Sequence, residues 1–182
     1  MKIPVNYFLF FSILFFKNIY SQELVIGEEK LKPGISVVFE GAIKDKIYPP
    51  KLNLEVDNTD VHIEARINWD NSNRPKGSPA GGFIPYLIVK AKITNRKTGR
   101  NILVDLIPHI NLNDNFHYAR NISLPGDIDN FYNIEFTIKP PENFNLSFHL
   151  DWSKKYGNKL IDEFNFKYNN INFYEVAKAK RN

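Results

Sequence analysis

Apolar and polar side chains alternate along several separate stretches of this 182-residue chain. The clearest case is residues 61–69, where apolar side chains fall on one side and polar side chains on the other: Ile63, Ala65, Ile67 and Trp69 against His62, Glu64, Arg66 and Asn68. Successive side chains of a β-strand point to opposite faces, so this period of two predicts half-buried strands.

Similar alternation predicts a series of strands with turn residues between them, at 35–43, 51–56, 61–69, 87–94, 134–138 and 146–152. The segment from Leu160 to Lys180 fits either a last strand or a short terminal helix. Helical periodicity is scarce elsewhere, and the length is that of one domain. We therefore expect a single-domain, all-β protein with an immunoglobulin-like β-sandwich.

The first 21 residues have the pattern of a secretory signal peptide. Lys2 gives a positive start, residues 7–16 are almost wholly apolar, and Ser21 provides a small residue at a cleavage edge. The apolar run is too short to span a bilayer comfortably, although a retained anchor is the alternative. The mature domain is then predicted to be residues 22–182.

The chain contains no cysteine, which excludes disulfides, thiolate metal ligands and thiol nucleophiles. A secreted domain without disulfides fits a bacterial periplasm better than an animal extracellular space. Removal of the leader takes away Lys2 and Lys17 and leaves 22 basic against 20 acidic side chains. This near-neutral balance gives no reason to expect nucleic-acid binding.

The four histidines all lie in polar surroundings, at positions 62, 109, 117 and 149. His62 and Glu64 leave the same face of one predicted strand, about 7 Å apart along it. His109 and His117 flank a loop in which Asp114 offers an oxygen, and His149 has an acidic neighbour in Asp151. Imidazoles with carboxylates are a usual ligand set for Fe(II), Cu(II), Mn(II) or Zn(II). A lone histidine is more often a hydrogen-bonding residue, so the residues alone leave a metal site and a structural role both open.

Six short motifs follow one another along the chain. They are Val-His-Ile-Glu-Ala-Arg at 61–66, the segment 79–90 with Phe-Ile-Pro-Tyr-Leu, Leu-Ile-Pro-His at 106–109, Asp-Asn-Phe-His-Tyr at 114–118, the segment 134–141 with its closing Pro-Pro, and Phe-His-Leu-Asp at 148–151. They resemble, in the same order, motifs of the periplasmic Fe(2+)-transport protein family, the soluble iron- and copper-binding partner of high-affinity iron permeases. The first is similar to the family's His-Leu-Glu-Ala-Asp signature, and the resemblance covers roughly residues 24 to 160.

The resemblance implies an immunoglobulin-like sandwich, commonly dimeric, with a metal near the dimer interface. It implies ligands at His62, Glu64, His117 and His149, with Asp114 as an auxiliary oxygen, and it places His109 where the family has a methionine. Arg66 stands where the family has aspartate. The implied cargo is Cu(II) or Fe(II)/Fe(III), with Mn(II) and Zn(II) as further options for a histidine-rich set.

The expected function is therefore that of a non-enzymatic periplasmic metal binder that supports iron uptake by an inner-membrane permease. The alternative is a structural or adhesive immunoglobulin-like module that binds no metal. An enzyme is disfavoured, because the sequence has no Ser-His-Asp grouping with a nucleophile turn and no phosphate loop.

Overall fold

The computed structural model describes residues 23–112, 116–142 and 145–180; the predicted signal peptide and Asp114 lie outside the described residues. The strands are β1 (Glu23–Leu31), β2 (Ile35–Ala42), β3 (Val61–Trp69), β4 (Ile88–Asn95), β5 (Asn101–His109), β6 (His117–Ile122), β7 (Phe131–Lys139) and β8 (Phe164–Asn172). Short helices lie between or after them: the 3-10 helices η1 (Pro50–Leu52) and η2 (Val56–Asn58), and the α-helices α1 (Leu150–Tyr156) and α2 (Tyr174–Lys178).

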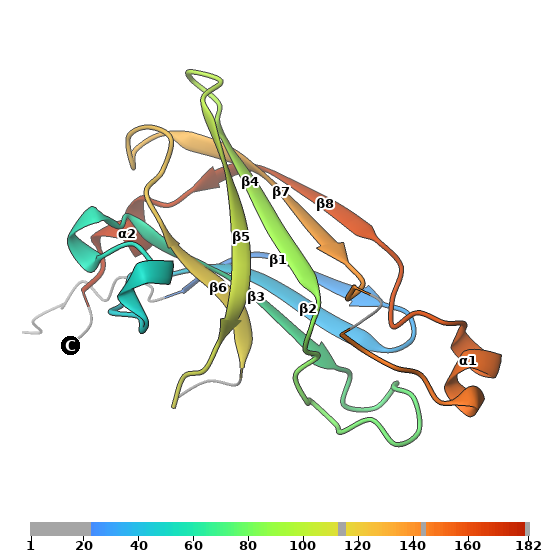
Figure 1. Ribbon diagram of the computed structural model, residues 1–182. Coiled ribbons are helices and arrows are strands. Elements are labelled where there is room, and N and C mark those ends of the chain that lie inside the picture. The colour runs from blue at the N-terminus through green and yellow to red at the C-terminus, as the bar shows by residue number, and fades with distance from the viewer. Residues whose placement is uncertain (1–22, 113–115, 143–144, 181–182) are drawn as a thin grey trace, which may run out of the picture.

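The strands form one antiparallel series in the order β1-β2-β3-β6-β5-β4-β7-β8, which curls into two facing layers and nearly closes (Figure 1). Strand β5 connects the layers. Residues 101–106 of β5 pair with β4, and residues 107–109 pair with β6. The all-β prediction is confirmed.

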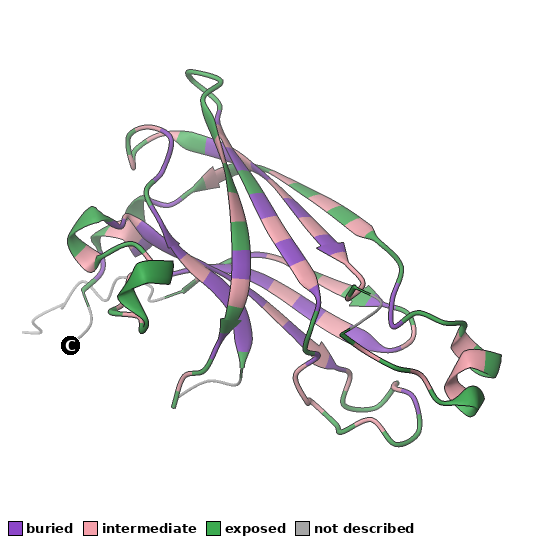
Figure 2. Cartoon of the chain, in the orientation of Figure 1, coloured by how far each residue is buried: buried purple, intermediate pink, exposed green. Residues whose placement is uncertain are grey.

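The core lies between the two layers, where buried positions follow the strands in alternation (Figure 2). Phe39 of β2 and Phe136 of β7 stack across the interior with ring centroids 4.0 Å apart. Ile63 and Ile67 of β3 are completely buried on the same inner side. Burial of each such side chain contributes about 1.5–3 kcal/mol, so the apolar face of each strand determines which way it turns.

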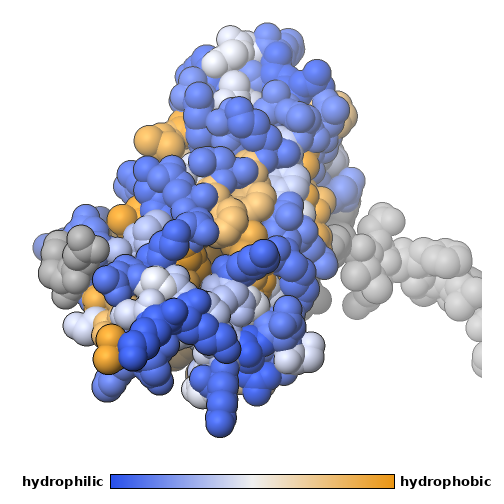
Figure 3. Space-filling model, turned by 90° about the vertical axis from the view of Figure 1, so that its right-hand side faces the viewer, coloured by the Kyte–Doolittle hydropathy of each residue, from blue (hydrophilic) through white to orange (hydrophobic). Residues whose placement is uncertain are grey.

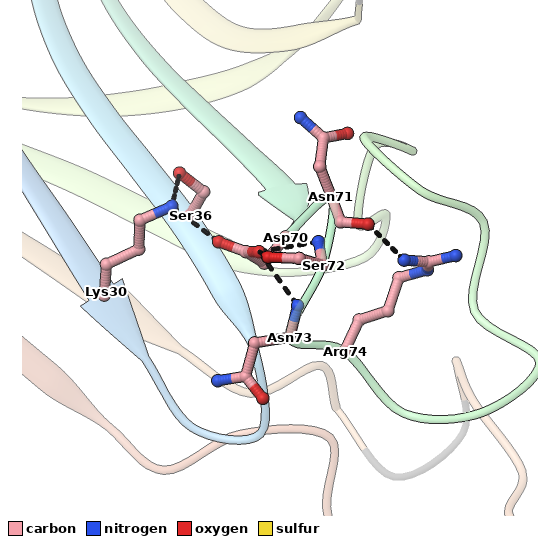
Figure 4. Close-up of polar contacts among 7 residues, drawn as sticks. All are labelled: Lys30, Ser36, Asp70, Asn71, Ser72, Asn73 and Arg74. Atoms are coloured by element: carbon pink, nitrogen blue, oxygen red, sulfur yellow. Dashed lines mark hydrogen bonds and ion pairs between the residues drawn. The ribbon is translucent and has the colours of Figure 1, made fainter.

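The far end of β3 is held by the loop that follows it (Figure 4). The Asp70 carboxylate accepts hydrogen bonds from the Lys30 ammonium and from the backbone N–H groups of Ser72 and Asn73. The ammonium and these donors hold the pKa of Asp70 well below its usual range. The loop that begins at Asp70 is thereby tied to β1, and this end of β3 is fixed in place.

Four predicted strands are confirmed, with small shifts of their ends: 35–43, 61–69, 87–94 and 134–138. The prediction at 51–56 is wrong, because this segment contains η1 and the start of η2 instead. The prediction at 146–152 is also wrong, since α1 begins at Leu150. Both alternatives offered for the C-terminal segment occur, as β8 followed by α2.

Helix α1 packs against the end of β3 through its aromatic residues. Trp152 contacts Trp69 in an edge-on arrangement, with ring centroids 6.3 Å apart.

Seen from the α1 side, the surface is mostly hydrophilic, with a strip of hydrophobic side chains at its centre (Figure 3). Within the part of the chain that the structure describes, no helix is both long and apolar enough to cross a bilayer.

Candidate metal centre

Strand pairing brings residues from three strands to the face of the sheet that points away from the core. His62 of β3 lies opposite Asn121 of β6, and Glu64 lies opposite Ala119. His109 of β5 lies opposite His117 of β6. Alternate residues of a strand share a face, so His117 and Asn121 project to the same side as Ala119 and hence as Glu64.

Three imidazoles converge on this face. One ring nitrogen from each of His62, His109 and His117 lies within 4.8 Å of the other two. The ring centroids are 5.3 Å apart for His62 and His109, 6.3 Å for His62 and His117, and 6.1 Å for His109 and His117. Nitrogens bound to one transition metal at about 2.1 Å lie roughly 3–4 Å apart. Small side-chain rotations would therefore bring all three nitrogens onto one ion.

The four candidate donor residues are all withdrawn from solvent, with 4% of His62, 8% of Glu64, 9% of His109 and 2% of His117 exposed. Both ring nitrogens of His109 are buried without a hydrogen-bond partner among the described residues. A buried polar group normally finds a partner, because leaving it unpaired costs about 1–3 kcal/mol. A metal ion would satisfy one of these nitrogens.

Burial also sets the protonation of His109. Desolvation lowers its pKa from 6.5 to about 4, and the nearby charges of His62, His117 and Arg120 act in the same direction. The ring is therefore neutral at physiological pH. A neutral imidazole offers the lone pair that a metal requires.

Glu64 adds a carboxylate to the cluster, with Oε1 3.7 Å from Nε2 of His62. On its other side Glu64 lies opposite Glu40 of β2, a residue that is almost completely buried. The Arg66 guanidinium donates to Glu40 Oε1 at 2.7 Å. Arg66, which differs from the aspartate of the resembling family, thus compensates a second carboxylate beside the cluster.

A cavity of about 470 Å³ opens directly onto the cluster. The four donors line it together with Asp45 and the segments 46–48 and 108–112. Tyr48, Ile110 and Leu112 are largely exposed at its rim. An ion or a small ligand could therefore reach the histidines from solvent.

The structure does not bring His149 to this cluster. His149 is an exposed residue at the N-cap of α1 and does not lie on a strand. Helix α1 contacts Trp69, seven residues beyond His62 on β3 and therefore roughly 23 Å away along the strand. The prediction that His149 lies on the polar face of a strand is wrong. Asp114 lies outside the described residues.

Two residues near the cluster were not anticipated from the sequence. Asn121 forms a hydrogen bond with His62, with Oδ1 2.8 Å from Nδ1. Asp45 belongs to the cavity lining. The even spacing of His117, Ala119 and Asn121 is a signal that could have placed Asn121 on the site face. No comparable pattern marks Asp45.

Part of this chain is similar in sequence to known proteins. Among curated proteins, a UPF0423 protein of Brucella abortus is 28% identical over 123 residues, which are 66% of this chain and 64% of the relative. The 34 kDa membrane antigen of Treponema pallidum is 30% identical over 102 residues, or 56% of this chain and 49% of the antigen. The chain thus matches less than two thirds of the length of either relative.

Solved structures share the fold over most of its extent. A copper-bound variant of P19 from Campylobacter jejuni is 25% identical, covers 81% of this chain and 95% of its own, and superposes with a TM-score of 0.67. A copper-bound variant of FetP from uropathogenic Escherichia coli strain F11 is 22% identical, covers 82% and 96%, and also has a TM-score of 0.67. The model of the family described as Fe2+ transport protein matches residues 20–174, and the chain therefore belongs to the Fe2+ transport protein family.

Proposed function

We propose that this chain is a periplasmic metal-binding protein that carries iron or copper and supports iron uptake by an inner-membrane permease. The observation that carries the proposal is the meeting of three imidazoles from three strands around His109, whose buried nitrogens have no partner among the described residues. Membership of the Fe2+ transport protein family and the copper-bound P19 structure support the same reading.

The proposed ligands within one chain are His62, Glu64, His109 and His117. Three imidazoles and a carboxylate form a borderline donor set that suits Cu(II), Fe(II), Fe(III), Mn(II) and Zn(II). The single methionine of the chain is Met1. The mature domain therefore has no thioether donor, and the set is less suited to Cu(I) than one that contains methionine.

We keep His149 and Asp114 as proposed additional ligands. Because His149 lies far from the cluster of its own chain, it could reach a metal only from a second copy. A homodimer that places α1 of one protomer near the cavity of the other would achieve this. The exposed side chains of Ile110 and Leu112 at the cavity rim provide apolar surface that such a contact would cover.

The proposed immunoglobulin-like assignment is supported by the strand order. With β2 to β8 named A to G, the series reads A-B-E-D followed by C-F-G, the arrangement of an immunoglobulin constant-type domain. Strand β1 is then an addition at the N-terminal edge. Residues 1–21 are proposed to direct export to the periplasm.

We propose carriage of a metal and no catalysed reaction. The described lining of the cavity contains no serine, threonine or cysteine that a histidine could activate as a nucleophile. Its donors instead surround one point. Binding requires deprotonated ligands, so release would follow acidification or a change in the oxidation state of the metal.

The test is a calorimetric titration of metal-stripped residues 22–182 with Cu(II), and anaerobically with Fe(II). One tight equivalent per chain is expected for the wild-type protein and should be lost in His62→Ala and His117→Ala. His149→Ala tests the ligand proposed to come from a second copy, and is measured across the range of protein concentration in which any dimer dissociates. An affinity loss confined to the dimer would support His149 as a ligand from the second copy.

Two results would contradict the proposal. Absence of binding by the wild-type chain would exclude a carrier and favour the structural or adhesive module. Binding that survives in both His62→Ala and His117→Ala would place the metal elsewhere.

A further inference from the structure

Asn121 is buried between His62 and the wall of the cavity, and its side chain has three contacts. Its Oδ1 lies 2.8 Å from Nδ1 of His62. Its amide Nδ2 donates to the backbone oxygens of Asp45 at 2.8 Å and of Leu54 at 3.0 Å. One side chain therefore joins a proposed ligand to the segment that forms one side of the cavity.

These contacts decide the orientation of the Asn121 amide. The Asp45 and Leu54 groups are carbonyl oxygens, which only accept hydrogen bonds, so the NH₂ group must face them. The Oδ1 atom then faces His62 and can only accept. The hydrogen atom of the bond must therefore come from the imidazole, at Nδ1.

The opposite nitrogen of His62, Nε2, lies on the side of Glu64. Glu64 Oε1 lies 3.7 Å from Nε2, beyond hydrogen-bond range, whereas the Asn121 contact is a normal 2.8 Å bond. The Asn121 bond therefore favours the tautomer that carries its proton on Nδ1. The lone pair of Nε2 then points to the side where Glu64 and the cavity lie.

We propose that Asn121 is a positioning residue that holds His62 in the Nδ1–H tautomer and presents Nε2 as its metal-binding nitrogen. The inference rests on the proposed function, since it concerns how the proposed metal ligand is prepared. Metal-binding histidines commonly donate their second ring N–H to an oxygen acceptor, which fixes the ring and its tautomer. Here an amide oxygen held in place by two backbone carbonyls serves as that acceptor.

The tautomer is measurable without any metal. Long-range ¹H–¹⁵N correlation spectra of metal-free residues 22–182, recorded at alkaline pH, distinguish the protonated from the unprotonated ring nitrogen. We expect His62 to be protonated at Nδ1 in the wild-type protein. In Asn121→Leu this preference should be lost, and affinity for Cu(II) should fall by about 10- to 100-fold.

Asn95→Leu is the matched control. Asn95 is also completely buried, and its Oδ1 accepts from the backbone N–H groups of Lys97 and Thr98. It adjoins the start of β5, roughly 26 Å along that strand from His109. The control should lose stability as any buried asparagine variant does, and keep both the His62 tautomer and the Cu(II) affinity.

The outcomes separate this inference from the proposed function. An Nε2–H tautomer in the wild-type protein, or a tautomer that Asn121→Leu leaves unchanged, overturns the role of Asn121 even if the metal binds. An Nδ1–H tautomer in a wild-type protein that binds no metal supports the positioning by Asn121 and contradicts the carrier. If Asn121→Leu does not fold, the wild-type spectrum still tests the proposal, because an Nε2–H ring overturns it.

Discussion

His109 and His117 form the last residue pair of the β5–β6 ladder, and their ring centroids lie 6.1 Å apart. The chain leaves the sheet after His109, and both rings line the cavity together with residues 110–112. His117 and His62 are positioned by two strands of one layer, whereas His109 comes from the strand that joins both layers. A substitution at position 109 is therefore the simplest way to change the set of candidate metal donors.

Replacing His109 by Met should change the metal preference of the site. A thioether is a softer donor than imidazole, so affinity for Cu(I) should rise and affinity for Zn(II) should fall, each by about ten-fold or 1.4 kcal/mol. Competition with chromogenic chelators measures both affinities. Leu103→Met, which adds a thioether at an exposed position of β5 outside the cavity lining, should alter neither. Equal affinities in His109→Met and wild type would remove His109 from the ligand set.

The stability of the metal-free protein should depend on pH through His109. Its pKa is lowered from 6.5 to about 4 in the folded chain, so between these values the unfolded chain binds a proton that the folded chain does not. The free energy of unfolding should therefore fall as the pH drops from about 6.5 to about 4, by up to about 3 kcal/mol, and this contribution should then level off. Urea unfolding at several pH values measures it. His109→Gln should lack this component; an identical pH profile in the variant would contradict the assignment.

Arg66 should stabilise the fold by compensating Glu40. Removal of one partner of a buried pair costs several kcal/mol, but the Arg66 side chain is 33% exposed, so we expect Arg66→Met to cost about 2–3 kcal/mol. Adding Glu40→Leu to this variant should recover most of the loss, because no buried carboxylate then remains at that position.

The control for Arg66 is Lys167→Met, which breaks the exposed pair with Glu135 and should cost less than about 1 kcal/mol. Chemical unfolding of the four proteins gives the comparison. A double variant no more stable than Arg66→Met would show that the arginine acts through its own packing.

Tyr118 should stabilise the strand that carries His117. Its buried hydroxyl accepts from the Leu87 backbone N–H at 3.0 Å and donates to the Ile84 backbone oxygen at 2.8 Å. Tyr118→Phe leaves both backbone groups without this partner and should cost about 1–3 kcal/mol. Tyr86→Phe, at a residue that is 55% exposed, should change stability by less than about 0.5 kcal/mol. Thermal unfolding of the two variants distinguishes these effects.

The central strands could be predicted from alternation because they combine it with one wholly apolar face, as β3 does. The segment 51–56 alternates as well, yet Leu52 and Leu54 remain exposed, and no strand in the described part of the chain pairs with them. Pro50 occupies the first position of η1, where its fixed φ suits a helical turn. Local alternation cannot report whether a partner strand exists.

Apolar side chains around His149 follow two spacings at once, one typical of a strand and one typical of a helix. Positions 146, 148, 150 and 152 alternate, but Phe148, Trp152 and Tyr156 also recur every four residues, and their rings contact in that order. Gly157 then ends the helix with φ of +83°, a conformation that favours glycine. Residues four apart lie on the same face of a helix, and this spacing matches the structure of the segment better than the alternation does.

The candidate ligands could be anticipated in part. The shared face of His62 and Glu64 follows from strand geometry alone. The proximity of His117 and His109 depends on the register of β6 against β3 and β5, which is a long-range property that no local pattern contains. For the same reason the sequence placed His149 with the other histidines, whereas its own chain holds it at α1.

The double pairing of β5 has a consequence for how a metal would leave. A shift of β5 by one residue would turn His109 to the opposite face, and the ladders with β4 and β6 both oppose such a shift. The candidate donors are thus ordered during folding, so metal binding does not carry the entropy cost of ordering them. Unloading such a site requires exchange of the ligands on the ion itself, with the surrounding sheet unchanged.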